Sequence, residues 1–117
     1  MKTSELTGAA LDWAVAKCEG EPVCFDGMTV RYVPGQFSDE EFYNPSTEWA
    51  QGGPIIEREG LFLCLAPFVE QPDEKWMATD KHGQVTEYGT TPLIAAMRCY
   101  VASKLGDDVE IPQELTP

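Results

Sequence analysis

Residues 89–106 read GTTPLIAAMRCYVASKLG, and this stretch carries the clearest helix signal in the chain. Thr91 is a suitable N-cap, and Pro92 suits the first helical position because its missing N–H needs no partner there. Gly106 is placed to end the helix. Between these limits an apolar stripe recurs at helical spacing, formed by Ile94, Met97, Val101 and Leu105. The pattern predicts a helix with one buried side, flanked by alanines that permit close packing.

A second helix is predicted near the start of the chain. Thr7 can cap it, and Leu6 and Leu11 occupy the two positions of a hydrophobic staple. Gly20 is placed to end this helix in a left-handed conformation. The apolar stripe between them consists of Leu11, Ala14, Val15 and Cys18. We expect the alanines of the two helices to bring them together.

The segments between the helices carry strand signals. Asp26-Gly27 separates two apolar runs and predicts a hairpin, because both residues tolerate positive φ. Residues 61–68 form a near-continuous apolar run, which predicts a buried central strand. A turn at 81–83 is expected to join two further strands. The order predicts an α+β fold, with an antiparallel sheet of about four or five strands covered on one face by two helices.

Length and charge limit the possible functions. The 117 residues suit one domain, residues 1–117, with an acidic tail at about 107–117. Binding to nucleic-acid phosphates needs clustered Lys and Arg, so the net charge of −12 argues against direct nucleic-acid binding. The acidity can maintain solubility, or it can imitate a polyanion and so occupy a basic partner. Because no signal peptide or transmembrane run is recognised, we expect a cytoplasmic protein without membrane contact.

Residues with catalytic or metal-binding chemistry are few and poorly spaced. The cysteines form no CxxC pair and are interpreted as small buried hydrophobic residues; they are Cys18, Cys24, Cys64 and Cys99. His82, the single histidine, lies in a His-Gly turn and is interpreted as an exposed turn residue. Phosphate-binding glycine motifs are absent from the sequence. We therefore predict no catalytic residue, no metal site and no cofactor.

Residues 46–60, STEWAQGGPIIEREG, form the most unusual stretch of the chain. Trp49 in a polar loop either plugs the core or marks a contact surface, and we favour the plug. Gly52-Gly53 predicts a tight turn, and Pro54 the start of a short helix whose free N–H groups could bind a small anion. The candidate binding residues of this stretch are Trp49, Gln51, Gly52, Gly53, Glu57 and Arg58.

Three segments together resemble a known family. They are TSELTGAALDWAVAKCEG at 3–20, STEWAQGGPIIEREG at 46–60 and GTTPLIAAMRCYVASKLGDDVEIPQEL at 89–115. Their order and content resemble the NinX-like proteins encoded by tailed phages and prophages, a family classed as a domain of unknown function. The resemblance implies a phage or prophage origin, an accessory role and a place in the host cytoplasm. It implies no catalytic residues.

Two classes of function are consistent with these features. The first is a non-enzymatic factor that binds a host or phage protein and that could itself be a homodimer. Its basis is the abundance of acidic and aromatic residues and the lack of a recognised catalytic constellation. The second is a small-molecule binder or enzyme that uses the 46–60 loop to hold an anionic ligand. A concave pocket beside residues 49–58 would favour the second class.

Overall fold

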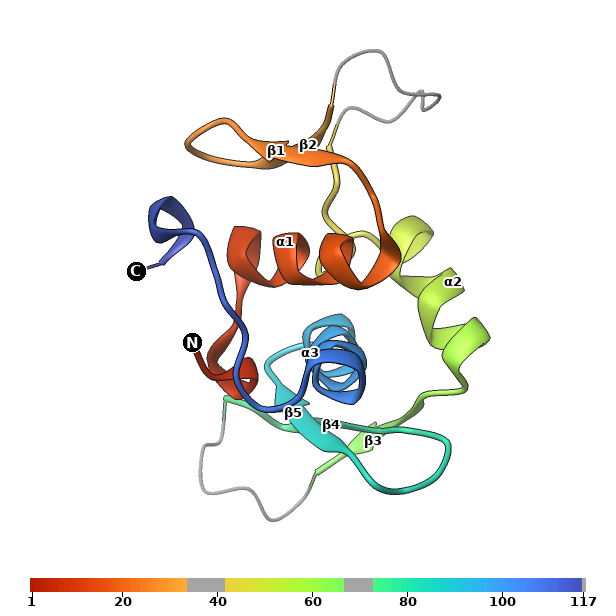
Figure 1. The fold of residues 1–117 in the computed structure, drawn as a ribbon. Coiled ribbons are helices and arrows are strands. Elements are labelled where there is room, and N and C mark those ends of the chain that lie inside the picture. Colours follow the sequence, from red (N-terminus) through yellow and green to blue (C-terminus); the bar gives the residue numbers. More distant parts are fainter. Residues whose placement is uncertain (34–41, 67–72, 117) are drawn as a thin grey trace.

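The computed structural model describes residues 1–33, 42–66 and 73–116, which form an α+β domain (Figure 1). The helices are α1 (Gly8–Glu19), α2 (Trp49–Glu59) and α3 (Pro92–Leu105), with short 3-10 turns η1 (Thr3–Glu5) and η2 (Gln113–Leu115). The strands are β1 (Val23–Phe25), β2 (Val30–Tyr32), β3 (Phe62–Leu65), β4 (Trp76–Thr79) and β5 (Thr86–Gly89).

Helix α3 is the centre of the molecule. It lies between α1 on one side and the β3–β5 sheet on the other (Figure 1), and it is buried along most of its length. Small residues make this close packing possible: a Cβ at Gly89 in β5 would stand 2.5 Å from the backbone nitrogen of Ala95. Ala95 and Ala96 are fully buried. The prediction of a helix that begins at Pro92 and ends at Gly106 is confirmed.

The predicted caps of the two long helices occupy the expected positions. Thr91 Oγ1 accepts a hydrogen bond from the Ile94 amide at 3.1 Å and caps α3. Gly20 ends α1 in the left-handed region, with φ 70°. Thr7 stands at the N-cap position of α1, but its side chain makes no capping bond.

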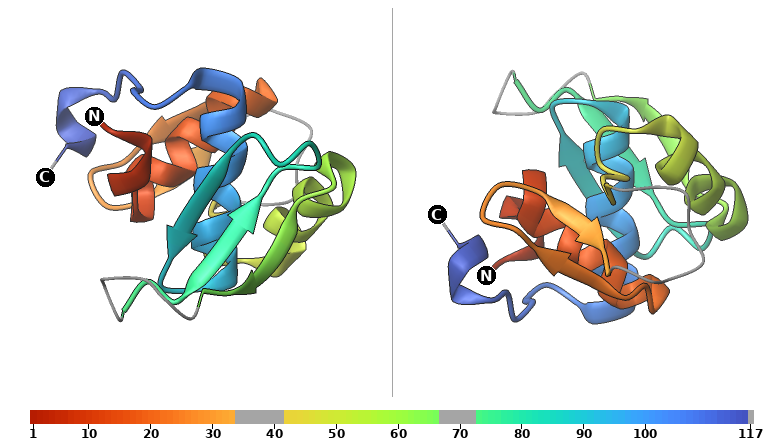
Figure 2. Two further views of the ribbon diagram at one scale, coloured as in Figure 1. Left: turned by 90° about the horizontal axis from the view of Figure 1, so that it is seen from below. Right: turned by 90° about the horizontal axis from the view of Figure 1, so that it is seen from above.

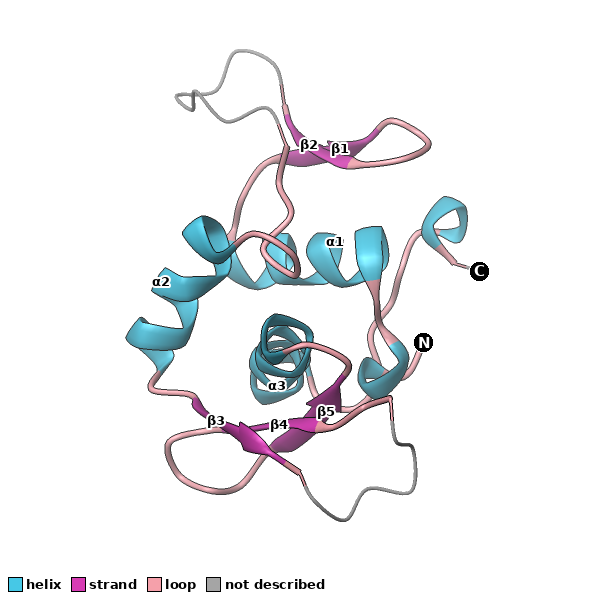
Figure 3. Ribbon diagram, turned by 180° about the vertical axis from the view of Figure 1, so that it is seen from behind, coloured by secondary structure: helices cyan, strands magenta, loops and turns pink. Residues whose placement is uncertain are grey.

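The strands form two separate sheets rather than the single sheet we predicted. β1 and β2 pair as an antiparallel hairpin, with Cys24 opposite Arg31. β3, β4 and β5 form an antiparallel sheet in that order. The hairpin and the sheet lie on opposite sides of the α1–α3 layer, as the views from the front and from behind both show (Figures 1 and 3). The helices therefore separate the two sheets, instead of both covering one face of a single sheet.

Strand β3 is also an edge strand, whereas we predicted a buried central strand at residues 61–68 (Figure 2). Phe62 is 66% exposed and Leu65 is 59% exposed. Leu63, between them, packs against the core. The apolar run thus contributes only alternate residues to the interior. Residues 67 and 68 lie outside the described part of the chain.

Helix α2 begins earlier than predicted. It starts at Trp49, so Gly52, Gly53 and Pro54 lie inside it and form neither a turn nor a helix start. The physical reason is close packing: a Cβ at Gly52 would lie 2.5 Å from the carbonyl oxygen of Pro45. The glycine lets this helix lie directly against the preceding loop.

The acidic tail is tied to the start of the chain by backbone hydrogen bonds. The Thr3 amide donates to the Asp107 carbonyl at 2.8 Å, and the Val109 amide donates to the Met1 carbonyl at 2.9 Å. Val109 is buried, as its apolar character predicts. The tail is therefore part of the fold.

Candidate functional site

A groove separates α1 from the β1–β2 hairpin. Its volume is about 360 Å³. It is lined by Gly8, Ala9 and Asp12 of α1, by Met28, Thr29 and Val30 of the hairpin, and by Phe42, Asn44 and Thr47. The lining mixes apolar side chains with a few polar groups, which is typical of binding sites.

Asp12 is the charged residue of this groove. It is 6% exposed, and its Oδ1 accepts a hydrogen bond from the Ser46 amide at 2.9 Å. Burial raises the pKa of the Asp12 carboxyl to about 6, because the charged form loses hydration. The hydroxyl of Ser46 is buried without a partner among the described residues. Asp12 thus holds the 44–46 loop and leaves a negative charge beside the groove at neutral pH.

The apolar rim of the groove is held in place by the hairpin. Asp26 accepts hydrogen bonds from the amides of Met28 at 2.9 Å and Thr29 at 2.7 Å, and from Arg31 Nε at 2.6 Å. These bonds lower the pKa of Asp26, with the backbone amides contributing most. The carboxylate of Asp26 therefore holds the tip of the β1–β2 hairpin in place. This tip carries Met28, which is 85% exposed.

Phe42 forms the other part of the rim. Its ring lies under the guanidinium of Arg31, with 4.7 Å from Cζ to the ring centroid. Phe42 also forms an isolated antiparallel bridge with Arg31, and its side chain is 40% exposed. The cation–π contact and the bridge orient the ring. An exposed methionine and an oriented phenylalanine thus flank one concave surface.

A second, smaller groove lies at the start of α1. Its volume is about 260 Å³, and it is lined by Met1, Glu5, Thr7, Ala9, Ala10, Phe25, Glu114, Leu115 and Thr116. Ala9 belongs to both grooves, so the two are neighbours. Glu5 and Glu114 add carboxylates to this side. The combined surface is apolar and acidic.

The residues predicted in the 46–60 stretch take separate roles. Trp49 is 54% exposed and does not plug the core, which corrects our preference and leaves the contact-surface interpretation. It lines a small cavity of about 200 Å³ with Ser46 and Thr91, at the starts of α2 and α3. Gln51 points elsewhere: its side chain accepts from the Asn44 amide at 2.7 Å and donates to the Phe42 carbonyl at 2.8 Å.

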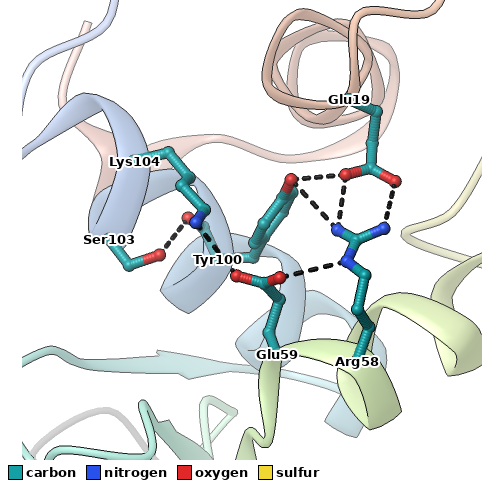
Figure 4. A network of polar contacts seen from close by, with 6 residues as sticks. All are labelled: Glu19, Arg58, Glu59, Tyr100, Ser103 and Lys104. Atoms are coloured by element: carbon teal, nitrogen blue, oxygen red, sulfur yellow. Dashed lines mark hydrogen bonds and ion pairs between the residues drawn. The ribbon is translucent and has the colours of Figure 1, made fainter.

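Arg58 belongs to a polar network that joins the three helices (Figure 4). Its guanidinium binds both carboxylate oxygens of Glu19, at 2.9 and 2.6 Å, and Glu59 at 3.0 Å. The Tyr100 hydroxyl also donates to Glu19, and Lys104 pairs with Glu59 at 3.1 Å. Hydrogen bonds from Arg58 lower the pKa of Glu19 and of Glu59. The network holds helices together, so we assign Arg58 a structural role.

The remaining predicted residues are not gathered around one cavity. Gly52 packs against Pro45 and Leu93, whereas the Cβ position of Gly53 faces open space. Glu57 is exposed on α2. Of the six candidates, Trp49 alone lines one of the cavities described above. The groove residues Met28, Phe42 and Asp12 were missed, because only the tertiary arrangement brings them together.

The described residues also limit the possible chemistry. The four cysteines carry free thiols, and burial raises the pKa of Cys18 to about 11 and that of Cys99 to about 12. Within the described ranges, no three His, Cys, Asp or Glu side chains are grouped closely enough to hold a metal ion. The lining of the larger groove contains no histidine, cysteine or lysine.

No described helix is long and apolar enough to cross a membrane.

Comparison with known proteins places the chain in a family. A search of curated proteins finds no significant match. The family model described as "Bacteriophage P22, NinX" matches residues 2–104, which include α1, α2, both sheets and all of α3 except its last residue. The chain therefore belongs to the phage P22 NinX family.

Proposed function

We propose that this chain is a non-enzymatic accessory factor of a phage or prophage, which acts in the host cytoplasm by binding a host or phage protein. The observation that carries the proposal is the rim of the larger groove, where Met28 is 85% exposed on a fixed turn beside Phe42. Exposed methionine and aromatic side chains at a concave surface are typical of protein-binding sites.

The charge around the groove indicates the partner's chemistry. Asp12 lies in the larger groove, and Glu5 and Glu114 lie in its neighbour. The chain as a whole has a net charge of −12. A basic segment with one large apolar side chain complements this surface, because the side chain fills the groove and the cations meet the carboxylates. Association with such a partner is expected to weaken as salt concentration rises.

The test is affinity capture from phage-infected host cells with matched variants. Met28→Asp removes the apolar rim, whereas Leu105→Asp makes the same charge change at an exposed residue of α3, away from the groove. We expect one specific partner to bind the wild type and the Leu105 variant but not the Met28 variant. A partner that binds all three chains equally, or no specific partner at all, would contradict the proposal.

A second candidate is the binding of a small anion at the cavity beside Trp49. Ser46, whose buried hydroxyl has no partner among the described residues, is one of the residues that line this cavity, where α2 and α3 begin. Helix starts favour anions through their free N–H groups. A thermal-shift screen with inorganic phosphate and nucleotides tests this candidate, because a ligand of the folded state raises Tm. Ser46→Ala should abolish such a shift, and the absence of any shift with the wild type would exclude the screened anions.

A further inference from the structure

Strand β3 has an open hydrogen-bonding edge. The Ala66 amide donates to the Lys75 carbonyl at 2.6 Å, and the same register continues through Cys64 opposite Met77. In an antiparallel pair the bonded positions alternate, so Leu63 and Leu65 direct their N–H and C=O groups away from β4. Among the described residues these outward groups have no partner.

The opposite edge of the sheet, at β5, is engaged by the protein itself. The outward carbonyl of Tyr88 accepts a hydrogen bond from Arg98 Nη1 at 2.7 Å. Arg98 is 6% exposed, and its Nη1 also pairs with Glu74 at 2.9 Å. A buried arginine thus occupies part of the β5 edge. Within the described residues, β3 is the edge whose outward groups are free to pair.

The β3 edge also lacks the features that usually prevent an edge strand from pairing with a strand of another molecule. Its sequence, Phe62–Leu65, contains no charge and no proline, although the chain as a whole carries a net charge of −12. Phe62 and Leu65 are mostly exposed, on opposite faces of the sheet. A second copy of this acidic chain meets the least electrostatic repulsion at such an uncharged strand. The edge is therefore suited to contact between like-charged molecules.

We propose that a second copy of the chain pairs with β3 in antiparallel fashion, so that the two three-stranded sheets become one sheet of six strands across a two-fold axis. Such a contact is isologous, because each strand is both donor and acceptor, and it closes as a dimer. It lies on the opposite side of the molecule from the β1–β2 hairpin (Figure 1), so it is independent of the groove and of the function proposed for it.

The chain itself selects the register. A two-fold axis at Leu63 would oppose Leu65 to the partner's Leu61, whose N–H already donates to the Ile56 carbonyl at 3.1 Å. An axis at Leu65 would oppose Leu63 to the partner's Pro67, which has no N–H. An axis at Cys64 opposes Leu63 to the partner's Leu65, so all the outward N–H groups of both strands are used.

This register has a consequence for side chains. Cys64 stands opposite the partner's Cys64 as a non-hydrogen-bonded pair, for which the Cα atoms of antiparallel strands are about 4.5 Å apart. That separation lies within the range that a disulfide spans. The exposed Leu65 lies beside the partner's Leu63, on the face of the sheet that α3 covers. A side chain that the monomer leaves in water thereby gains an apolar neighbour.

Sedimentation analysis of the full chain over a range of concentrations tests the association. The contact is short, so we expect a concentration-dependent dimer rather than a permanent one. Leu65→Lys should weaken the dimer at least tenfold, because it places an ammonium group beside the partner's Leu63 on each side of the axis. Leu105→Lys, at another exposed leucine, should leave the dimer unchanged. Circular dichroism verifies that both variants fold.

A thiol cross-link tests the register. Mild oxidation with diamide, which takes up the two electrons and two protons of a thiol pair, should join two chains through Cys64. Cys64→Ser should abolish the cross-linked dimer, and Cys24→Ser, at the exposed cysteine of β1, should retain it. The proposal is wrong if the wild type stays monomeric up to about 1 mM, if Leu65→Lys leaves association unchanged, or if the cross-link persists without Cys64. A monomer that pairs β3 only with a different protein would equally contradict it.

Discussion

Arg58 at the end of α2 and Glu19 at the end of α1 form a two-bond ion pair, with Nη1–Oε1 at 2.9 Å and Nη2–Oε2 at 2.6 Å. The two residues are 39 positions apart in the chain. Tyr100 of α3 donates to the same carboxylate, so one acidic side chain connects all three helices. This junction fixes how α2 sits on the rest of the domain, and it is absent from any local sequence pattern.

Replacing Arg58 should loosen this junction. Arg58→Met is expected to lower the free energy of unfolding by about 1 kcal/mol, a modest value because the arginine is 52% exposed and water screens the pair. Arg58→Lys keeps the charge but loses the paired geometry, so it should restore only part of the loss. Urea denaturation measures both. Glu57→Gln, at the exposed neighbouring position, should change stability little; an equal loss there would contradict a specific role for Arg58.

Asp12 should make stability fall as pH rises. Its pKa is raised from 3.8 to about 6 in the folded protein, so between these values the native state binds the proton more tightly than the unfolded state. Asp12→Asn removes this dependence and keeps an oxygen acceptor for the Ser46 amide. We expect the stability of the Asn variant relative to wild type to increase by about 2 kcal/mol from pH 4 to pH 7. A relative stability that stays constant across this range would show that Asp12 titrates normally.

Gly52 and Gly53 are a matched pair on one helix. Gly52→Ala should destabilise the protein by about 2 kcal/mol, because the new Cβ meets the Pro45 carbonyl and the Leu93 side chain. Gly53→Ala meets open space and should stabilise the helix by about 0.5–1 kcal/mol through backbone entropy. Thermal unfolding compares the two variants. Equal effects of the two changes would contradict the close approach of α2 to the 44–46 loop.

The exposure of Trp49 predicts its fluorescence behaviour. Trp49 is 54% exposed, whereas Trp13 and Trp76 are partly buried against the core. Acrylamide, which is neutral and therefore unaffected by the net charge, should quench one readily accessible fraction of the emission. Trp49→Phe should remove most of that fraction. If the quenching profile of the variant matches that of the wild type, Trp49 is shielded in solution, and its role as a contact residue fails.

Local signals predicted the elements better than their arrangement. Thr91 and Pro92 start α3, and Gly20 ends α1, because caps and backbone conformation depend on a few neighbouring residues. The hairpin at Asp26-Gly27 was also recognised, although its connection has the four residues 26–29, because Phe25 pairs with Val30. The division of the strands into two sheets was not predicted. Turn signals indicate which strands are joined, but they do not indicate against which element each pair of strands packs.

The site was harder to predict for a related reason. Gln51 and Arg58 were predicted as candidate binding residues, but the side chain of Gln51 bonds to Phe42 and Asn44, and that of Arg58 to Glu19. Glu19 lies 39 positions from Arg58, outside the window of a periodic pattern. Phe42 and Asn44 are close to Gln51 in sequence, but they lie in an irregular segment that has no periodic pattern. The glycines of the same stretch were assigned to a turn, since Gly-Gly before proline usually breaks a helix. Tertiary packing against Pro45 overrode that preference.

The central position of α3 has a consequence for synthesis. The helix spans residues 92–105, and α1, α2 and the β3–β5 sheet all pack around it. A ribosome produces each of those partners before it produces α3. Until α3 is synthesised, α1, α2 and the β3–β5 sheet lack the helix against which their apolar side chains pack. Completion of the core must therefore follow translation of residues 1–105.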